Sequence, residues 1–480
     1  MKKILITALT IITLGSCQSD DVYESLNTDP KNPVEVEASS LFNSATKSLF
    51  DQMTSTSVNT NIFRMLGQHW TETTYTDEAN YDFTTRSIPG THWSEMYENV
   101  LFDLKSAKEI VDADDELTQE EKDSRNAQIE VLEIYTWAQL VETFGDIPYS
   151  QALNDSEYIL PEYDDAVTIY SDLISRLNTV IPTISGTGFD SSDPIYSGDA
   201  TSWTKFGYSL LLRMGLRVID VSEMTDEATD AINTAISGGV FTSNDDNAEI
   251  TYESSTPNTN PVWVDLVQSG RSDFVPANTL VDFMNNLNDP RRAYYFDDNL
   301  GEDTYLGGIY GATNAYTSYS HIGDPMLDPE NPACLIDYAE VSFYLADVAE
   351  RGISSSSGDA ETLYNAGITA SFDYWGATNV EDYLANADVA YTTAPGTWKE
   401  KIGNQLWIAM YNRGYEAWTS WRVYDSPTFN LPGDEDEKSP VPTRYTYPVD
   451  EQNLNEANYN EASNAIGGDT QTTKLFFDVE

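Results

Sequence analysis

The chain has 480 residues, with 79 Asp and Glu against 25 Lys and Arg, so its formal net charge at pH 7 is −54. Nucleic acids, anionic lipid surfaces and polyanionic substrates are therefore poor partners, because binding a polyanion requires clustered Lys and Arg side chains. Hydrophobic residues at 40% and aromatic residues at 12% supply a packed core, which excludes an acidic disordered chain, and the length allows one large domain or two to three ordinary ones.

The N-terminal segment has the features of an export signal. Two lysines precede an apolar stretch at residues 4–14, and the run ends in Leu14-Gly15-Ser16-Cys17. The stretch is too short to cross a hydrocarbon core of about 30 Å. Small residues before a cysteine resemble the lipobox of bacterial lipoproteins, which implies a signal peptide at 1–16 and lipidation of Cys17; the alternative is an ordinary secretory signal with an incidental cysteine.

The residues after Cys17 indicate where the protein would be anchored. The run Gln18-Ser19-Asp20-Asp21 resembles the acidic tag that sends some lipoproteins to the outer face of the outer membrane. Residues 17–36 are polar and contain two prolines, as expected of a lipidated tether. We therefore expect a protein that is lipid-anchored in the outer membrane and faces the cell exterior, with its folded part at 37–480.

Helices dominate residues 37–480, which we interpret as one domain. Apolar residues from Trp93 to Val111 follow spacings of 4 and 3, which predicts one face of a helix. The same spacing returns from Ala127 to Val141, and that helix should end at Gly145. Further helices are predicted at 164–180, 200–220, 225–237, 337–351, 359–375 and 398–413. Many of them form pairs with short connections, which predicts a mainly α, irregular tetratricopeptide-like scaffold of helical hairpins.

Two long stretches do not have helical patterns. Residues 240–332 and 423–480 are rich in Asn, Asp, Gly, Pro and Tyr. Loops of this length are usually functional or disordered, and their aromatic content argues against disorder. We expect them to be loop-rich insertions that form a ligand-binding face.

Catalytic and metal-binding motifs are absent from the sequence. It contains no His-Glu-x-x-His, no Gly-x-Ser-x-Gly and no phosphate-binding Gly-rich loop, and we predict neither an enzyme nor a cofactor. The acidic run at 112–116 lacks the spacing of a calcium loop and indicates a solvated helix connection. The acidic run at 434–437 likewise indicates a solvated turn. Cys334 has an apolar context and is interpreted as a buried small side chain.

Several stretches in sequence order resemble the SusD/RagB family of nutrient-binding outer-membrane lipoproteins, in its SusD-like branch with an N-terminal Asn-Thr-Asp-Pro motif. One segment departs from the pattern, because residues 421–427 lack the paired arginines and the Gly that relatives tend to carry there. The matching stretches are Leu26–Pro33, Trp137–Tyr149, Gly198-Asp199 with Trp203–Phe206, Asn288–Arg291, Tyr338–Val341 and Gln405–Ala409.

The resemblance implies a tetratricopeptide-like scaffold, tethered by lipid, that acts as a lid on a SusC-like TonB-dependent outer-membrane barrel. Such proteins bind oligosaccharides and deliver them to the barrel without catalysis, and RagB-type members bind peptides instead. The acidity of this chain makes anionic glycans costly to bind. A neutral oligosaccharide is the expected ligand, with a β-glucan such as laminarin, or starch, as the better candidates.

Ligand sites in the resembled family are built from loops in two regions of this sequence. Aromatic rings stack on sugar rings, and polar side chains bond to hydroxyls, so loop residues that alternate the two types are candidates. We expect Trp70 to be exposed, because it lies outside the helical phase that begins at Trp93; His69 is either a hydrogen-bond donor beside it or a packed neighbour. The candidates are Gln68, His69, Trp70, Tyr75, Asn80, Tyr81, Arg86, Tyr305, Tyr310, Tyr316 and Tyr319.

Four other tryptophans lie in helical patterns and are interpreted as core. These are Trp93, Trp137, Trp203 and Trp407.

Overall fold

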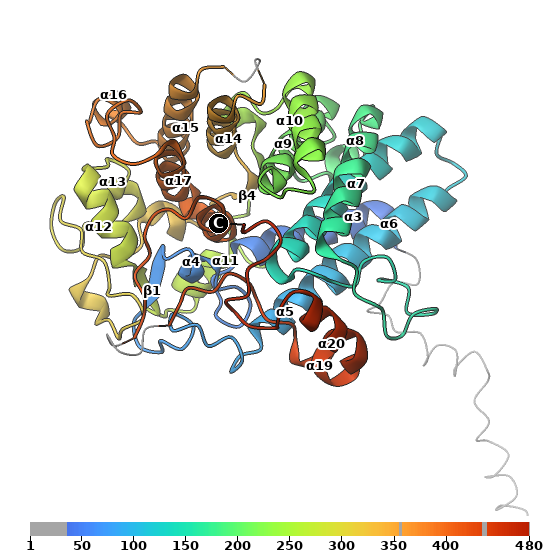
Figure 1. The fold of residues 1–480 in the computed structure, drawn as a ribbon, viewed down its shortest axis with the longest axis horizontal. Coiled ribbons are helices and arrows are strands. Elements are labelled where there is room, and N and C mark those ends of the chain that lie inside the picture. The colour runs from blue at the N-terminus through green and yellow to red at the C-terminus, as the bar shows by residue number, and fades with distance from the viewer. Residues whose placement is uncertain (1–35, 355–357, 434–438, 480) are drawn as a thin grey trace, which may run out of the picture.

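The structure is a computed structural model that describes residues 36–354, 358–433 and 439–479 (Figure 1). The predicted signal peptide, Cys17 and the tether up to residue 35 lie outside the described residues, as does the acidic run at 434–437. Element labels follow Figure 1, in which α3 is the first described helix.

Helices make up most of the described chain, and the prediction of a mainly α fold is confirmed. The longer helices are α3 (Ala38–Thr54), α6 (Phe102–Ala113), α7 (Gln119–Phe144), α8 (Ala166–Val180), α9 (Ala200–Val218), α10 (Thr225–Gly238), α12 (Asn278–Leu287), α14 (Tyr338–Arg351), α15 (Ala360–Trp375), α17 (Trp398–Ala409), α18 (Gly414–Tyr424) and α20 (Glu456–Ala465). The shorter α-helices are α4 (Phe63–Leu66), α5 (Ile88–Ser94), α11 (Pro261–Trp263), α13 (Arg292–Tyr295), α16 (Val380–Leu384) and α19 (Val449–Leu454).

Short π- and 3₁₀-turns and four strands complete the secondary structure. The π-helical segments are η1 (Glu95–Leu101) and η5 (Val264–Gln268). The 3₁₀ segments are η2 (Ile181–Thr183), η3 (Asp190–Ser192), η4 (Asn244–Asp246), η6 (Tyr316–Ser318), η7 (Asp324–Leu327) and η8 (Met410–Asn412). Strand β1 (Trp70–Glu72) pairs antiparallel with β3 (Phe274–Pro276), and β2 (Ala248–Ile250) with β4 (Ala333–Ile336).

The helices predicted from periodicity are present, and local signals explain their ends. The helix expected from Trp93 is continuous through α5, η1 and α6. Helix α7 begins with a capping box, in which the Thr118 side chain accepts from the Glu121 amide and the Glu121 carboxylate accepts from the Thr118 amide. It ends at Gly145, whose φ of +89° suits a residue without a Cβ.

The helices pack in sequential pairs, which gives the stacked-hairpin arrangement visible in Figure 1. Helix α9 packs on α10, α14 on α15, and α6 on α7, with α7 also against α8. Of the acidic run at 112–116, Asp114, Asp115 and Glu116 lie in the connection between α6 and α7, as predicted, whereas Asp112 lies in the last turn of α6.

Sequence patterns missed several helices. Helix α3 was not predicted, although Phe42, Ala45 and Leu49 are spaced 3 and 4 apart and are fully buried. The stretches expected to be free of helix contain α12 and α20 along with shorter turns, so that expectation is wrong at these places. Most of the remainder of both stretches is irregular, and residues 294–321 run beside the β1·β3 pair.

A network of buried charges joins the helix pairs at the centre. Arg213 of α9 donates two hydrogen bonds to the Glu340 carboxylate of α14, at 2.6 and 2.8 Å. Arg217 donates to Glu416 of α18 at 2.8 Å, and both side chains are almost fully buried. Breaking such a pair would leave an uncompensated charge in the interior, so the network fixes how α9, α14 and α18 are positioned relative to one another.

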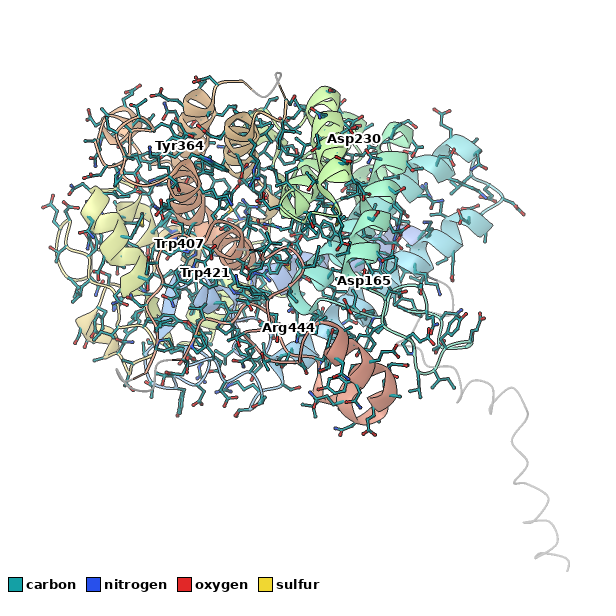
Figure 2. All side chains as sticks on the ribbon, in the orientation of Figure 1. Asp165, Asp230, Tyr364, Trp407, Trp421 and Arg444 are labelled. Carbon is teal, nitrogen blue, oxygen red and sulfur yellow. The ribbon has the colours of Figure 1, made fainter. Side chains whose placement is uncertain are left out.

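The interpretation of the helical tryptophans as core is confirmed for three of them. Trp137, Trp203 and Trp407 are buried, the last labelled in Figure 2, whereas Trp93 is half-buried. Cys334 is buried in β4, as expected. Within the described ranges, no helix has the length and apolar character needed to span a membrane.

Candidate functional site

The first candidate segment, residues 68–86, divides into a buried part and an exposed part. The expectation that Trp70 is exposed is wrong, because only 1% of its surface is accessible. Its ring lies under the Arg64 guanidinium at 5.1 Å, and its Nε1 donates to the Tyr411 hydroxyl at 3.0 Å. A ring enclosed in this way has no free face for a sugar, so Trp70 is a core residue in this structure.

Gln68 and His69 are also fully buried, which corrects their proposed role beside an exposed ring. Gln68 links α4 to the segment that follows α18, since it donates to the Asn430 carbonyl oxygen at 2.6 Å. His69 Nε2 donates to the Trp407 carbonyl oxygen at 3.0 Å. Burial lowers the pKa of His69 to about 3, so the ring is neutral. Of the two roles considered for His69, the packed neighbour is the one that the structure shows.

Tyr81 and Tyr310 are buried as well, and neither presents a ring to solvent. The Tyr310 hydroxyl donates to the Met65 carbonyl oxygen at 2.8 Å, and its ring centroid lies 6.1 Å from that of Tyr81. Asn80 joins the two candidate loops, because its Nδ2 donates to the Gly311 carbonyl oxygen at 2.7 Å. Arg86 forms an ion pair with the buried Glu78. These side chains hold the loops together.

A pair of carboxyl groups lies buried in the same loop. The Glu72 carboxylate accepts from the Ala79 amide at 2.9 Å and lies beside Glu78. Burial, together with the hydrogen bond to Glu78, raises the pKa of Glu72 to about 9. Glu72 is therefore protonated at neutral pH and can donate to the Glu78 carboxylate, which closes the loop that carries Tyr75.

Tyr75 is the exposed aromatic residue of this segment, with 63% of its surface accessible. The loop leaves β1 beside β3, and the Thr73 amide donates to the Asp273 carbonyl oxygen at 2.8 Å. Arg271 lies near Tyr75: its pKa is raised, first by the hydrogen bond to Asp273 and to a smaller extent by Tyr75. A guanidinium and an exposed phenol ring therefore lie together on the surface.

The second candidate segment reaches the same surface. The Asn314 amide donates to the Thr73 carbonyl oxygen at 2.8 Å, which places η6 beside the Tyr75 loop. The Tyr316 ring stacks on His321, with centroids 3.9 Å apart and planes at 12°. Burial raises the pKa of Tyr316, while a hydrogen bond with the Ser272 side chain lowers it, so this ring borders the Arg271 segment. His321 also lies 3.6 Å from the Asp297 carboxylate.

We name this surface the aromatic face and define it by Tyr75, Arg271, Tyr316 and His321. It offers ring surfaces for stacking and a guanidinium, imidazole and phenol groups for hydrogen bonds with hydroxyls. Sequence reasoning missed Arg271, which lies outside both aromatic-rich regions, and His321, which lies two residues beyond the last candidate tyrosine, Tyr319. The antiparallel β1·β3 pairing brings Arg271 to Tyr75, and three-residue strands leave too weak a pattern to be predicted.

Tyr305 and Tyr319 are half-buried and stay predictions. The Arg292 guanidinium lies 5.5 Å from the Tyr305 ring centroid, and the Tyr319 carbonyl oxygen accepts from Asn299.

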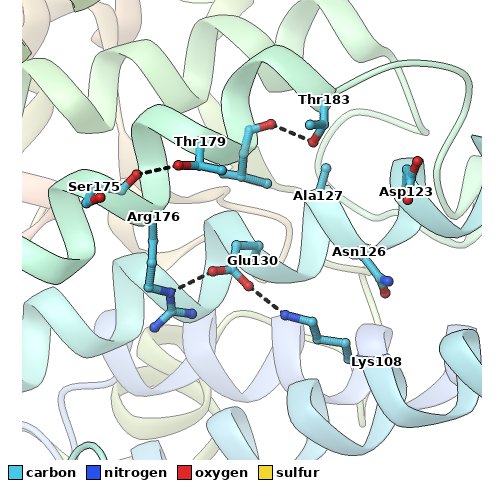
Figure 3. A pocket seen from close by; sticks show the side chains of 10 residues that line it. Lys108, Asp123, Asn126, Ala127, Glu130, Ser175, Arg176, Thr179 and Thr183 are labelled. Carbon is cyan, nitrogen blue, oxygen red and sulfur yellow. Dashed lines mark hydrogen bonds and ion pairs between the residues drawn. The ribbon is translucent and has the colours of Figure 1, made fainter.

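A polar pocket of about 420 Å³ lies elsewhere, between α6, α7 and α8 (Figure 3). Its charged groups neutralise one another: Glu130 accepts from Lys108 at 2.8 Å and from Arg176 at 2.7 Å. The remaining lining groups include hydroxyls that bond to their own helix, such as Thr179 to the Ser175 carbonyl oxygen. We assign no ligand to this pocket, because both of its cations are already paired with Glu130 and its other carboxylate, Asp123, accepts from Gln119 of the same helix.

Metal-assisted chemistry has no visible centre in the part of the chain that the structure describes. No group of three or more His, Cys, Asp or Glu side chains there is arranged to hold a metal ion.

Comparisons with known proteins agree on one family. A family described as "Starch-binding associating with outer membrane", with the name SusD-like, matches residues 30–448. No curated protein matches the sequence.

Solved structures share the fold over more than nine-tenths of this chain. A chitin-binding protein is 24% identical, with a TM-score of 0.78 over 92% of this chain and 100% of its own. A chitin-binding SusD homolog from Flavobacterium johnsoniae is 23% identical, with a TM-score of 0.76 over 92% and 99%. A SusD homolog from Bacteroides thetaiotaomicron is 22% identical, with a TM-score of 0.77 over 93% and 100%. At these identities the similarity shows the fold alone.

Proposed function

The chain belongs to the SusD-like family, described as starch-binding and associated with the outer membrane, and on this premise we propose that it is a non-catalytic binding protein for neutral oligosaccharides. The observation that carries the proposal is the aromatic face. Tyr75 is exposed and Tyr316 stacks on His321, on a surface formed by loops from distant parts of the sequence.

The chemistry of this face fits a neutral sugar. Pyranose rings present C–H faces that pack on aromatic rings, and their hydroxyls both donate and accept hydrogen bonds. Arg271 can donate to a ring oxygen or hydroxyl, and the Asp273 and Asp297 carboxylates nearby can accept. A sulfated or uronic glycan would meet these carboxylates and the net charge of −54, which opposes its binding.

The oligosaccharides to be tested are chosen from the composition of the chain and from its family. Neutral β-1,3-glucan and starch fragments fit the acidic surface, and two solved relatives are named as chitin-binding. Calorimetric titration with laminarihexaose, maltohexaose and chitohexaose, followed by chromatography of the products, tests the proposal. We expect binding of at least one hexasaccharide with no cleavage. Cleavage would instead indicate an enzyme, and binding of peptides alone would indicate the RagB-type function.

We further propose lipid anchoring at Cys17 and a complex with a SusC-like TonB-dependent barrel, both supported by the sequence and by family membership. A lipidated protein need not use its own surface to hold the membrane, so its faces stay free for ligand and partner. Co-purification from detergent-solubilised native membranes should yield the barrel. Recovery of the protein without any such barrel would contradict the partner proposal and leave the glycan proposal to be judged by calorimetry.

The site itself is tested with matched tyrosine variants. Tyr316→Ala removes the ring that stacks on His321 and should weaken hexasaccharide binding about thirtyfold, because a central aromatic contact is commonly worth about 2 kcal/mol. Tyr158→Ala is the control, since Tyr158 is 36% exposed on the connection between α7 and α8. Equal binding by both variants and the wild type would remove the aromatic face from the proposal.

A further inference from the structure

A second pocket, separate from the aromatic face, lies where three segments meet. Its volume is about 420 Å³, and it is formed by the helix from α5 through α6, the connection between α7 and α8, and helix α19. Its aromatic walls are Trp93, Tyr97 and Phe102, and its two acidic groups are Glu98 and Glu451. Figure 1 shows α5 beside α19 at the bottom of the view, whereas α12 and α13 lie at the left.

The π-helical turn η1 explains why these aromatic residues share one wall. Trp93, Tyr97 and Phe102 are four and five residues apart, and a π-turn brings positions five apart onto one face. The Trp93 and Tyr97 ring centroids are 4.8 Å apart. Phe102 is 49% exposed, which is unusual for so large an apolar side chain and leaves its ring available at the mouth of the pocket.

Hydrogen bonds fix the segments that form the walls of the pocket. The Tyr97 hydroxyl donates to the Pro148 carbonyl oxygen at 2.6 Å and so fixes the α7–α8 connection. The Tyr163 hydroxyl donates to the Glu451 carboxylate at 2.7 Å, and Asn455 donates to the Pro161 carbonyl oxygen at 2.9 Å. These contacts dock α19 on the same connection, so the walls are preformed, as is typical of small-molecule sites.

Two acidic side chains, Glu98 and Glu451, line the pocket. No Lys or Arg forms an ion pair with Glu98 or Glu451 in the described ranges. Lys105 contacts the pocket-lining residue Leu153, because its ammonium donates to the Leu153 carbonyl oxygen at 2.6 Å, but its ion pair is with Glu109. Burial, followed by the charge of Glu451, raises the pKa of Tyr97 well above its ordinary value. The pocket is therefore apolar in its walls and negative in potential.

We propose that this pocket binds an organic cation with a flat apolar body, such as an arylalkylammonium ion. Aromatic faces attract cations, most strongly Trp, and an unpaired carboxylate adds a direct ionic contact. A neutral sugar lacks the charge that would use two carboxylates, and an anion would be repelled by them. The proposal is independent of the glycan function, because no residue of the aromatic face lines this pocket.

The test uses three probes with the same ring and different charge. The full chain is titrated by calorimetry with 2-phenylethylamine, 2-phenylethanol and 3-phenylpropanoate at low salt. We expect the amine to bind at least about tenfold more tightly than the alcohol, and the carboxylate not to bind. High salt should weaken the amine alone, since screening reduces the ionic contact. Equal affinity of amine and alcohol, or no binding of the amine, overturns the proposal.

Matched variants assign the binding to the pocket. The double variant Glu98→Gln with Glu451→Gln should lower the amine affinity about tenfold and leave the alcohol unchanged. Glu451→Gln keeps an oxygen that can accept from the Tyr163 hydroxyl. If the double variant is less stable than the wild type, the single variant Glu98→Gln is titrated in its place. Glu109→Gln is the control, because this exposed carboxylate lies on α6 outside the pocket. Unchanged amine binding in the Glu98 and Glu451 variants overturns the assignment.

Discussion

Replacing Trp70 by alanine should lower the free energy of unfolding, because the side chain belongs to the core and makes no contact with a ligand on the aromatic face. The side chain is 1% exposed and packs against Arg64, Phe274 and Tyr411. Truncating a buried aromatic residue costs about 3–5 kcal/mol of unfolding free energy through lost contacts and the cavity left behind. The Tyr411 hydroxyl loses its donor but still donates to the Tyr295 carbonyl oxygen at 3.0 Å, so no buried hydroxyl is stranded. The expected loss is therefore within this range.

Trp70→Phe separates packing from hydrogen bonding. It keeps a ring above Phe274 but removes the Nε1 donor to Tyr411 and weakens the contact with the Arg64 guanidinium. We expect a loss of about 1–2 kcal/mol, smaller than for alanine. Urea unfolding followed by circular dichroism measures both variants.

Tyr75→Ala is the matched exposed substitution. Because 63% of Tyr75 is accessible, its removal should change the unfolding free energy by less than about 0.5 kcal/mol. Calorimetry should nevertheless show weaker hexasaccharide binding. The reasoning is refuted if Trp70→Ala unfolds within about 1 kcal/mol of the wild type, or if it is Tyr75→Ala that destabilises the fold.

Three further substitutions have distinct readouts. Burial raises the pKa of Glu72 from about 4.5 to about 9, so the unfolding free energy of the wild type should fall as pH rises through this window. Glu72→Gln should remove this pH dependence. If the unfolding free energies of the wild type and the variant change equally between pH 5 and pH 8.5, the prediction is contradicted. Glu416→Gln removes one of the two buried carboxylates that pair with Arg217, the other being Glu142, and should cost up to about 3–5 kcal/mol in urea unfolding; a cost near zero would show that Glu142 alone is a sufficient counter-charge. Cys17→Ala should leave the membrane fraction in cell fractionation; firm retention would disprove lipidation at this residue.

The helical scaffold could be predicted because its periodicity is long and local. From Trp93 to Val111 and from Ala127 to Val141, each residue's environment is set mainly by its own helix and the adjacent one. Helix α3 has the same apolar spacing in Phe42, Ala45 and Leu49, so this helix too could have been predicted from periodicity. Helix α12 is ten residues long and follows a strand, and such a length leaves few repeats to detect.

The candidate site was predictable only in part, because exposure depends on residues far along the chain. Trp70 looks like a loop aromatic from its neighbours, yet Tyr411, 341 residues later, receives its hydrogen bond. Tyr310 is covered in the same way by α4, through its bond to Met65. Tyr75 comes from the first of the two sequence regions and is exposed, whereas Tyr316 comes from the second and is half-buried against His321. Composition identified the regions, and tertiary packing decided which rings remain exposed.

The distribution of cations connects the acidity of the chain with the ligands that it can bind. Seven arginines are buried among the described residues, where they bond to carboxylates or carbonyl oxygens: Arg64, Arg213, Arg217, Arg291, Arg413, Arg422 and Arg444. With 25 Lys and Arg in the whole chain, a large share of the positive charge therefore serves the core, and the surface keeps an excess of carboxylates. On the aromatic face, Arg271 is already bonded to Asp273. The hydroxyls of a neutral sugar can donate hydrogen bonds to such carboxylates without charge repulsion. An anionic glycan would need exposed cations to pair with, and many of the cations of this chain are buried in its interior. The same excess of carboxylates favours a cation in the pocket lined by Trp93, Glu98 and Glu451, so one feature of composition governs selectivity at two separate places.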